Sequence, residues 1–163
     1  MRRLLAAAAV TVSAVAGAAA GASAAPVTQR PAYGTEYVQI MSASVTPAPA
    51  SAIARGVFTA AGRADLGSGQ TGTLVFPFGT ITLSHQPSHG TSQIDPRTCL
   101  NIISQDGTYQ IVGGTGRYAG IRGHGTYQLS LEFVSARSHG QCTSGKPPVA
   151  QQELLRLSGP VRL

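Results

Sequence analysis

The stretch IRGHGTYQLSLEFVS, residues 121–135, has the clearest pattern in the chain. Its odd-numbered positions carry apolar side chains or glycine before the final Ser135, and its even-numbered positions up to residue 132 carry polar or charged side chains. The apolar members are Ile121, Tyr127, Leu129, Leu131 and Phe133. Alternation with a period of two is typical of an antiparallel strand that buries one face. The stretch therefore predicts an all-β protein.

Other strand-like runs lie between clusters of glycine and proline. Residues 151–157 contain good helix formers, but the flanking prolines favour a last strand there. The expected strands cover residues 37–45, 53–61, 73–78, 80–85, 99–104, 108–112, 121–135 and 153–163. About eight strands with short glycine-rich turns fit a single antiparallel β-barrel or a β-sandwich. The barrel is preferred because closure removes exposed sheet edges.

Two local features predict how neighbouring strands connect. Asp106-Gly107 is a dipeptide typical of a two-residue hairpin turn, so it predicts a turn between two short strands. The apolar face changes phase between Phe78 and Ile81. One extra residue moves a strand pattern to the other face, so this change predicts a bulge or a corner near Pro77.

The first 24 residues predict a secretory signal peptide. Arg2 and Arg3 precede an apolar stretch over residues 4–20, and small residues form a cleavage pattern that ends at Ala24. A membrane anchor is the alternative, but this stretch is rich in alanine and is broken by Thr11 and Gly17. Residues 25–36 are then expected to form a flexible tail and residues 37–163 the barrel domain. The mature protein is expected to be extracellular, with no membrane span.

The two cysteines, Cys99 and Cys142, both lie in the exported part. An even number of cysteines in an oxidising compartment predicts one disulfide. A C-x-x-C motif, which is typical of redox pairs, is absent. The predicted disulfide is therefore a structural cross-link.

The charge pattern argues against a nucleic-acid partner. The formal net charge of +6 falls to +4 when Arg2 and Arg3 leave with the signal peptide. Lys146 is the single lysine, and the remaining arginines are scattered along the chain. A nucleic-acid binder would instead cluster its basic residues among aromatic ones.

The segment GTYQIVGGTGRYAG, residues 107–120, is the most distinctive motif. It contains Gly113, Gly114, Gly116 and Gly120. Glycine adopts positive φ without a steric penalty, so the motif predicts a tight structural turn between two strands. It is not a dinucleotide fingerprint, because Gly120 comes one residue late and no helix is expected to follow.

This segment, followed by IRGHGTY, resembles the allene oxide cyclase-like and dirigent-like barrel proteins. It looks most like uncharacterised secreted actinobacterial members of that group. DPRTC at residues 95–99 and CTSGKPP at residues 142–148 add to the resemblance, which covers roughly residues 53–163. The resemblance implies an eight-stranded barrel with a central cavity, often assembled as a homo-trimer. It also implies either cyclisation of an unsaturated fatty-acid epoxide or steering of radical coupling. Glu132 matches no catalytic position of the group, so the catalytic residues are unknown.

Aromatic side chains are the candidate ligand-binding residues. They are Tyr109, Tyr127, Phe76, Phe78 and Phe133. An eight-stranded barrel is just wide enough to hold either packed side chains or one small ligand. Core packing is therefore the alternative role of the same residues.

The sequence contains no clear motif for metal binding or nucleophilic catalysis. His85 and His89 have the i, i+4 spacing of a helical metal site, but Pro87 and Gly90 oppose a helix, so no metal or cofactor is predicted. There is no G-x-S-x-G motif. The preferred function is a secreted, non-enzymatic binding or scaffold protein for a small apolar molecule. The alternatives are a cyclase- or dirigent-like isomerase and a cell-envelope interaction protein that uses its outer surface.

Overall fold

The computed structural model describes residues 32–44, 49–67 and 69–163. The described chain is all-β, with one short 3₁₀ helix, η1 (Gly116–Tyr118). The strands are β1 (Tyr33–Ser42), β2 (Ala50–Arg55), β3 (Ala60–Asp65), β4 (Thr71–Phe76), β5 (Gly79–Asp95), β6 (Leu100–Gly114), β7 (Arg122–Val134), β8 (Arg137–Ser138), β9 (Gln141–Cys142) and β10 (Ala150–Arg162).

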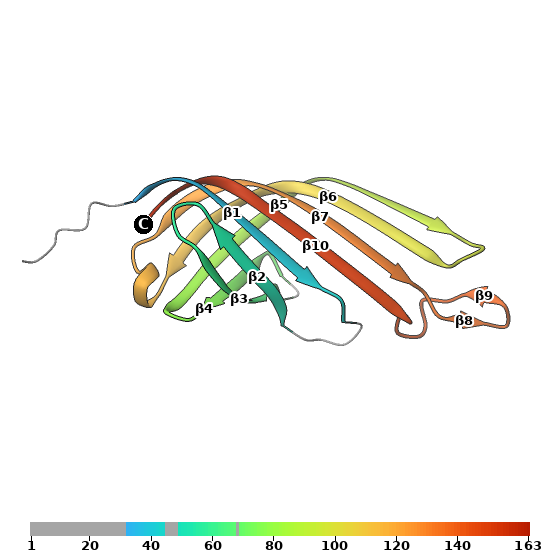
Figure 1. Ribbon diagram of the computed structural model, residues 1–163. Helices are drawn as coiled ribbons and strands as arrows, with labels where there is room; N and C mark the ends of the chain where they lie inside the picture. The colour runs from blue at the N-terminus through green and yellow to red at the C-terminus, as the bar shows by residue number, and fades with distance from the viewer. Residues whose placement is uncertain (1–31, 45–48, 68) are drawn as a thin grey trace, which may run out of the picture.

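Eight of these strands form one closed antiparallel barrel in the order β1-β10-β7-β6-β5-β4-β3-β2 (Figure 1). Closure confirms the predicted barrel and excludes the sandwich. β8 and β9 form a separate two-stranded ribbon. The described ranges contain no helix with the length and apolar character needed to cross a membrane.

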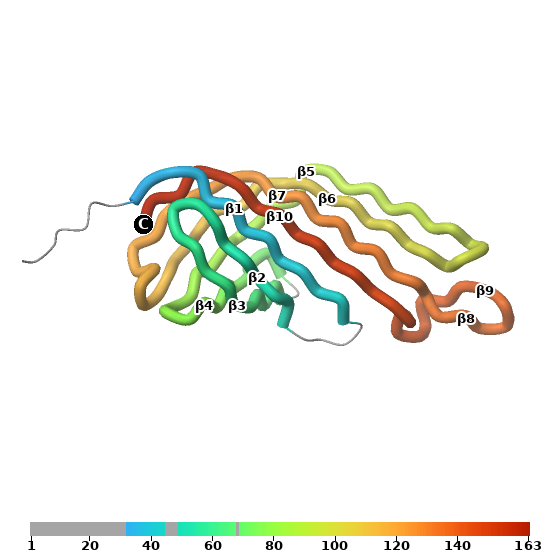
Figure 2. The backbone as a smooth tube through the Cα atoms, viewed as in Figure 1, coloured from blue at the N-terminus to red at the C-terminus, as the bar shows by residue number. Residues whose placement is uncertain are grey.

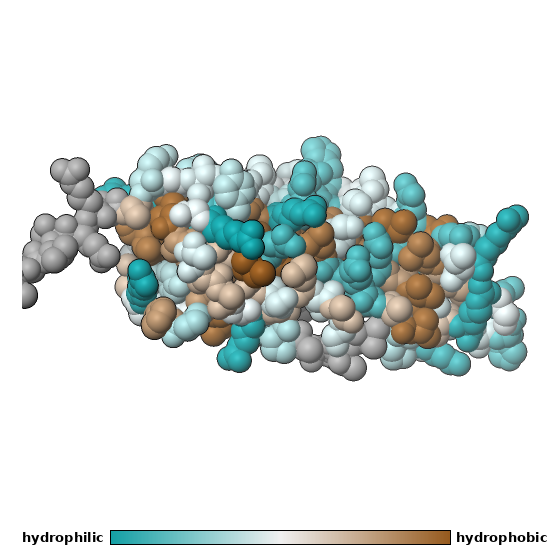
Figure 3. All heavy atoms as spheres, viewed as in Figure 1, coloured by the Kyte–Doolittle hydropathy of each residue, from teal (hydrophilic) through white to brown (hydrophobic). Residues whose placement is uncertain are grey.

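The long strands continue beyond the barrel as an open sheet (Figures 1 and 2). β5 has 17 residues, whereas β2, β3 and β4 have six each. We call this open sheet the extension. It comprises residues 89–95, 100–106, 128–134 and 150–156, which lie in register across β5, β6, β7 and β10. Apolar side chains gather over its far end on the face shown in Figure 3.

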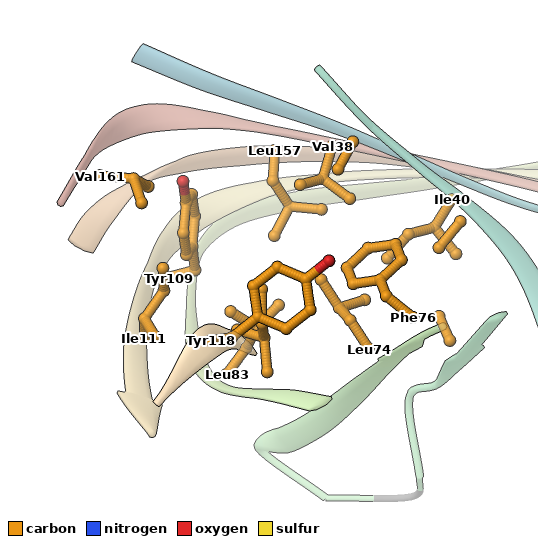
Figure 4. Packing of buried hydrophobic residues seen from close by; sticks show 14 of the residues in the cluster. Val38, Ile40, Leu74, Phe76, Leu83, Tyr109, Ile111, Tyr118, Leu157 and Val161 are labelled. Atoms are coloured by element: carbon orange, nitrogen blue, oxygen red, sulfur yellow. The ribbon is translucent and has the colours of Figure 1, made fainter. Parts of the chain in front are cut away.

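Inward-facing side chains fill the closed part of the barrel (Figure 4). Three aromatic rings close the end beside η1: Phe58, Phe76 and Tyr118 have ring centroids 5.0–5.9 Å apart. Ile40 and Ile121 are at most 1 % exposed. Truncating side chains this well buried typically costs about 2–5 kcal/mol, so this core supplies much of the stability.

The first strands differ from the prediction. Residues 53–61, expected as one strand, contain the end of β2, a hairpin turn at Gly56 and the start of β3. Gly56 has φ 141°, and a Cβ there would clash with the Thr35 carbonyl oxygen. β1 begins at Tyr33, which pairs with Arg162, so residues 33–36 belong to the barrel rather than to a tail. The predicted signal peptide lies outside the described residues.

The predicted hairpin turn at Asp106-Gly107 is wrong, because β6 runs through it. Gly107 pairs with Pro87 of β5 on one side and with Tyr127 of β7 on the other. The register of β5 shifts between Pro87 and His89, so Ser88 forms a bulge at this point. Proline has no N–H to donate to the ladder. It is tolerated at a bulge because the ladder is already interrupted there.

The phase change after β4 is also explained differently. Phe76 pairs directly with Gly79, so Pro77 and Phe78 are the two turn residues of the β4–β5 hairpin. The expected bulge or corner is therefore a tight turn. Gly79 has φ 150°, and a Cβ there would clash with the Thr115 carbonyl oxygen.

The glycine motif forms the connection from β6 to β7 through η1. Gly116 and Gly120 have φ values of 58° and 84°. Positive φ was also expected at Gly113 and Gly114, but both lie at the end of β6 without it. Gly114 is needed for a different reason, because a Cβ there would clash with the Tyr118 carbonyl oxygen.

The predicted disulfide between Cys99 and Cys142 is present. It joins β9 to the tip of the β5–β6 hairpin, at the far end of the extension (Figure 1). The Ser135 N–H donates to the Cys99 carbonyl at 3.0 Å, and the Arg137 guanidinium donates to the Arg97 carbonyl. These contacts fix the β8–β9 ribbon against that hairpin.

Candidate functional site

A cavity of about 210 Å³ lies at the mouth of the barrel, where the closed part meets the extension. Its apolar walls are Leu66, Leu83, Leu129, Leu155 and Leu157. Its polar side chains are His85, Gln105, Tyr109, Tyr127 and Glu153. Gly67 and Gly69, which follow β3, and Gly72 of β4 line one side.

Strand alternation directs these side chains into the cavity. Leu157, Leu155 and Glu153 lie on the inward face of β10, where they pair with Tyr127, Leu129 and Leu131 of β7. The first two continue the apolar face of the core, and Glu153 replaces the next apolar residue in the series. A carboxylate therefore lies among side chains that otherwise exclude water.

Tyr127 is the best-fixed polar member of the wall. Its hydroxyl donates to Gln105 Oε1 at 3.2 Å. The His85 ring meets it edge-on, with centroids 5.7 Å apart and an interplanar angle of 87°. Such edge-to-face contacts contribute about 0.5–1.5 kcal/mol beyond burial. The ring positions are thus set before any ligand arrives.

Glu153 gives the cavity its charge. Burial disfavours the ionised form and raises the pKa of its carboxyl above the ordinary value. No hydrogen bond or ion pair from the described residues reaches this carboxylate. No lysine or arginine lines the cavity. The carboxylate can therefore accept a proton or a hydrogen bond from a ligand.

A second, wider cavity of about 390 Å³ adjoins the first, since both are lined by Leu66, Gly67 and Glu153. Asp65 and Ser42 add polar groups to its wall. The two cavities form a cleft with a leucine-lined inner part and an acidic outer part.

Burial also raises the pKa of two other groups inside the barrel, Glu36 and Tyr109. Glu36 is 2 % exposed; its Oε2 accepts the Phe58 N–H at 3.1 Å, and its Oε1 has no hydrogen-bond partner among the described residues. Burial raises the pKa of Glu36 despite this backbone hydrogen bond. Burial, with the charge of Glu36, raises the pKa of Tyr109 to about 12. Tyr109 therefore keeps its proton and remains a hydrogen-bond donor.

The structure brings together two of the five aromatic candidates. Tyr109 and Tyr127 line the mouth cavity. Phe76 packs in the closed-end cluster, Phe78 is 65 % exposed on the β4–β5 turn, and Phe133 lies half-buried on the extension. None of these three lines the mouth cavity.

His85, Gln105 and Glu153 were not predicted as site residues. Two of them carry a signal in the alternation. His85 continues the inward phase of Ile81 and Leu83, and Glu153 continues that of Leu155 and Leu157. A polar residue in an apolar series of a strand marks a candidate site inside a barrel.

The histidine pair does not form a metal site. His85 lines the cavity, whereas His89 lies beyond the bulge, and its Nδ1 is 3.2 Å from Asp106 Oδ2 on the outer face. Across the described ranges, no group of three or more His, Cys, Asp or Glu side chains could hold a metal ion.

No model of a known protein family matches the chain, and no curated protein or solved structure matches it. The resemblance to allene oxide cyclase-like and dirigent-like barrels therefore stays a prediction.

Proposed function

We propose that the protein is a secreted binding protein whose barrel mouth holds a small amphipathic molecule. The observation that carries the proposal is the leucine-lined cavity of about 210 Å³, at whose edge the Glu153 carboxylate has no hydrogen-bond or ion-pair partner among the described residues. Side chains fill the closed part of the barrel, so a ligand bound inside the barrel would lie at its mouth.

The size of the cavity limits the ligand. Pockets for drug-sized molecules usually measure about 300–1,000 Å³, so the inner cavity suits only the apolar end of a ligand. The rest of the molecule would occupy the adjoining cavity of about 390 Å³. Burial of the apolar end favours binding by about 25 cal/mol per Å² removed from water.

The charge of the cleft selects the polar group. Glu153 lines both cavities, Asp65 lines the outer one, and neither cavity is lined by a lysine or an arginine. A hydrogen-bond donor, above all a protonated amine, would gain a charge-assisted contact that a carboxylate ligand could not form. The proposed ligand is therefore a small apolar amine. An alcohol of the same size should bind more weakly.

Secretion is part of the proposal. The disulfide supports it, because disulfides persist in oxidising compartments. The expected signal peptide at residues 1–24 agrees with this placement.

The test compares an alkylamine, an alcohol and a carboxylate of equal chain length by calorimetry. We expect the amine to bind best and the carboxylate worst. Glu153→Gln should weaken amine binding by roughly 10- to 100-fold, because it removes a charge-assisted hydrogen bond. Glu132→Gln, on the outer face of β7, is the matched control and should change nothing. If the carboxylate binds as well as the amine, the proposed specificity is wrong.

A cavity-filling variant tests the site itself. Leu155→Trp places a large ring in the inner cavity and should abolish binding of all three ligands. The chain has no tryptophan, so this ring is also a single fluorescent probe. Unchanged binding in a folded Leu155→Trp variant would place the ligand elsewhere.

A second candidate function is an isomerase that moves a proton on a bound apolar substrate. The raised pKa of Glu153 favours it, because a carboxylate with a raised pKa is a stronger base. Tyr109 and Tyr127 line the same cavity and could donate hydrogen bonds to a substrate oxygen. Stereospecific conversion of an unsaturated epoxide, lost in Glu153→Gln, would favour this function over simple binding.

A further inference from the structure

Along the extension, one side of β5 has no partner among the described strands. β4 pairs with residues 79–84 of β5, and the His85 N–H donates to the Gln70 carbonyl. No described strand pairs with that side of residues 86–95, and all ten residues are exposed. In Figures 1 and 2 this stretch forms the outer margin of the extension.

A free edge carries unpaired N–H and C=O groups that can pair with another strand. Proteins protect such edges with bulges, prolines or lysines. Here Pro87 and the bulge at Ser88 protect only the beginning of the edge. The ladder from His89 to Asp95 is regular and contains no lysine or arginine, so it is free to pair.

We propose that residues 89–95 pair antiparallel with the same residues of a second copy of this chain, about a two-fold axis at Ser92. In this register Ser92 lies opposite Ser92 of the second copy. His89 lies opposite Asp95, Gly90 opposite Ile94, and Thr91 opposite Gln93. The two extensions then form one continuous sheet. A two-fold contact of this kind closes after two copies, so it yields a dimer rather than a fibre.

Charge complementarity selects this register and this occupant. His89 and Asp95 lie on the same outer face of β5, opposite Asp106 and Leu100 of β6. Pairing about Ser92 places a histidine opposite an acid at both ends of the ladder. Pairing about Thr91 or Gln93 places neither His89 nor Asp95 opposite the other. The edge is therefore complementary to itself.

Packing on the inner face fits the same register. Ile94 is 57 % exposed in the single chain. Opposite Gly90 of the second copy its side chain would meet a residue without a side chain. Gly90 has room there, since a Cβ built on it would have its nearest neighbour, the Ser104 carbonyl oxygen, at 3.7 Å.

A cysteine scan of the edge tests the register. Directly opposite residues of an antiparallel pair have Cα atoms about 4.5–5.5 Å apart, within the range of about 4.4–6.8 Å that a disulfide spans. Ser92→Cys should therefore cross-link two chains under mild oxidation. Thr91→Cys and Gln93→Cys are matched controls, because each residue lies diagonal to its own copy. Equal cross-linking of all three variants would overturn the register.

Light scattering and sedimentation of the unmodified protein test the dimer itself. We expect twice the mass of one chain, and a monomer or a trimer would overturn the proposal. His89→Ala removes the imidazole from both proposed contacts with Asp95 of the second copy, so it should raise the dissociation constant by roughly 2- to 30-fold. His139→Ala changes an exposed histidine of the β8–β9 ribbon and should leave the constant unchanged. Equal effects of the two substitutions would remove the charge argument.

Discussion

Gly107 lies directly opposite Tyr127 in the β6–β7 ladder, and the Tyr127 ring covers it. A Cβ on Gly107 would lie 2.7 Å from Tyr127 Cε1 and would clash with the Gln86 carbonyl oxygen. We predict that Gly107→Ala lowers the free energy of unfolding by roughly 1–3 kcal/mol, the usual cost of overpacking. It should also weaken ligand binding, because Tyr127 must leave its place in the cavity wall. Denaturant unfolding and calorimetry measure the two effects.

Gly113→Ala is the matched control on the same strand. A Cβ at Gly113 would meet no atom within 4 Å, and this glycine has no positive φ. The substitution should leave stability unchanged or raise it by about 0.4–1 kcal/mol, since alanine restricts the unfolded chain. If both substitutions lower the free energy of unfolding equally, the close contact between Gly107 and Tyr127 is not the reason for a glycine at position 107.

The role of Gly107 explains why the sequence misplaced a turn. Asp106-Gly107 has the chemistry of a hairpin turn, but the same glycine serves a contact with a strand 20 residues further on. Local sequence does not distinguish the two uses. β7 and β10 were predicted well because their alternation directly records which face is buried. β2 and β3 consist largely of alanine, glycine and serine, and such small side chains leave little pattern.

Part of the site was predictable because alternation within a strand shows which side chains face inward. Tyr109 and Tyr127 followed from the expectation that inward aromatics line a barrel. Glu153 and His85 could have been found as polar residues in an inward apolar series. Their position beside Gly67 and Gly72 depends on barrel closure and on the register of β10 against β7, which alternation within one strand does not determine.

Glu36 should make stability depend on pH. Burial raises its folded pKa above the ordinary value of a glutamate, about 4.5. Its contribution is therefore fully present below about pH 4.5 and is lost as pH rises through the folded pKa. We predict that the free energy of unfolding of Glu36→Gln rises relative to the unmodified protein as pH increases from 4.5 towards neutrality.

Denaturant unfolding at a series of pH values measures this difference. Glu132→Gln, on the outer face of β7, controls for the loss of a carboxyl group outside the barrel interior. Parallel curves for Glu36→Gln and the unmodified protein would show that the buried carboxyl carries no such cost.

Glu153 should make amine binding depend on pH. An amine binds the ionised carboxylate, and burial raises the pKa of Glu153. Affinity should therefore increase as pH rises through that raised pKa, above the range in which an exposed glutamate ionises. Calorimetric titrations with one alkylamine over this range measure the effect. The Glu153→Gln variant should lose that rise, and a rise of equal size in the variant would assign it to another group.

The disulfide should stabilise the far end of the extension without being needed for the barrel. Cys99 and Cys142 are 43 residues apart in sequence, and loop-closure entropy for that length gives about 4 kcal/mol as an upper value. Neither cysteine belongs to the core cluster of the barrel. We predict that the double variant Cys99→Ala, Cys142→Ala loses at most this amount and keeps its barrel. Hydrogen exchange should rise mainly over residues 135–149, which the cross-link and the Ser135 hydrogen bond hold in place. Faster exchange throughout β1, β7 and β10 would instead show that the whole barrel depends on the cross-link.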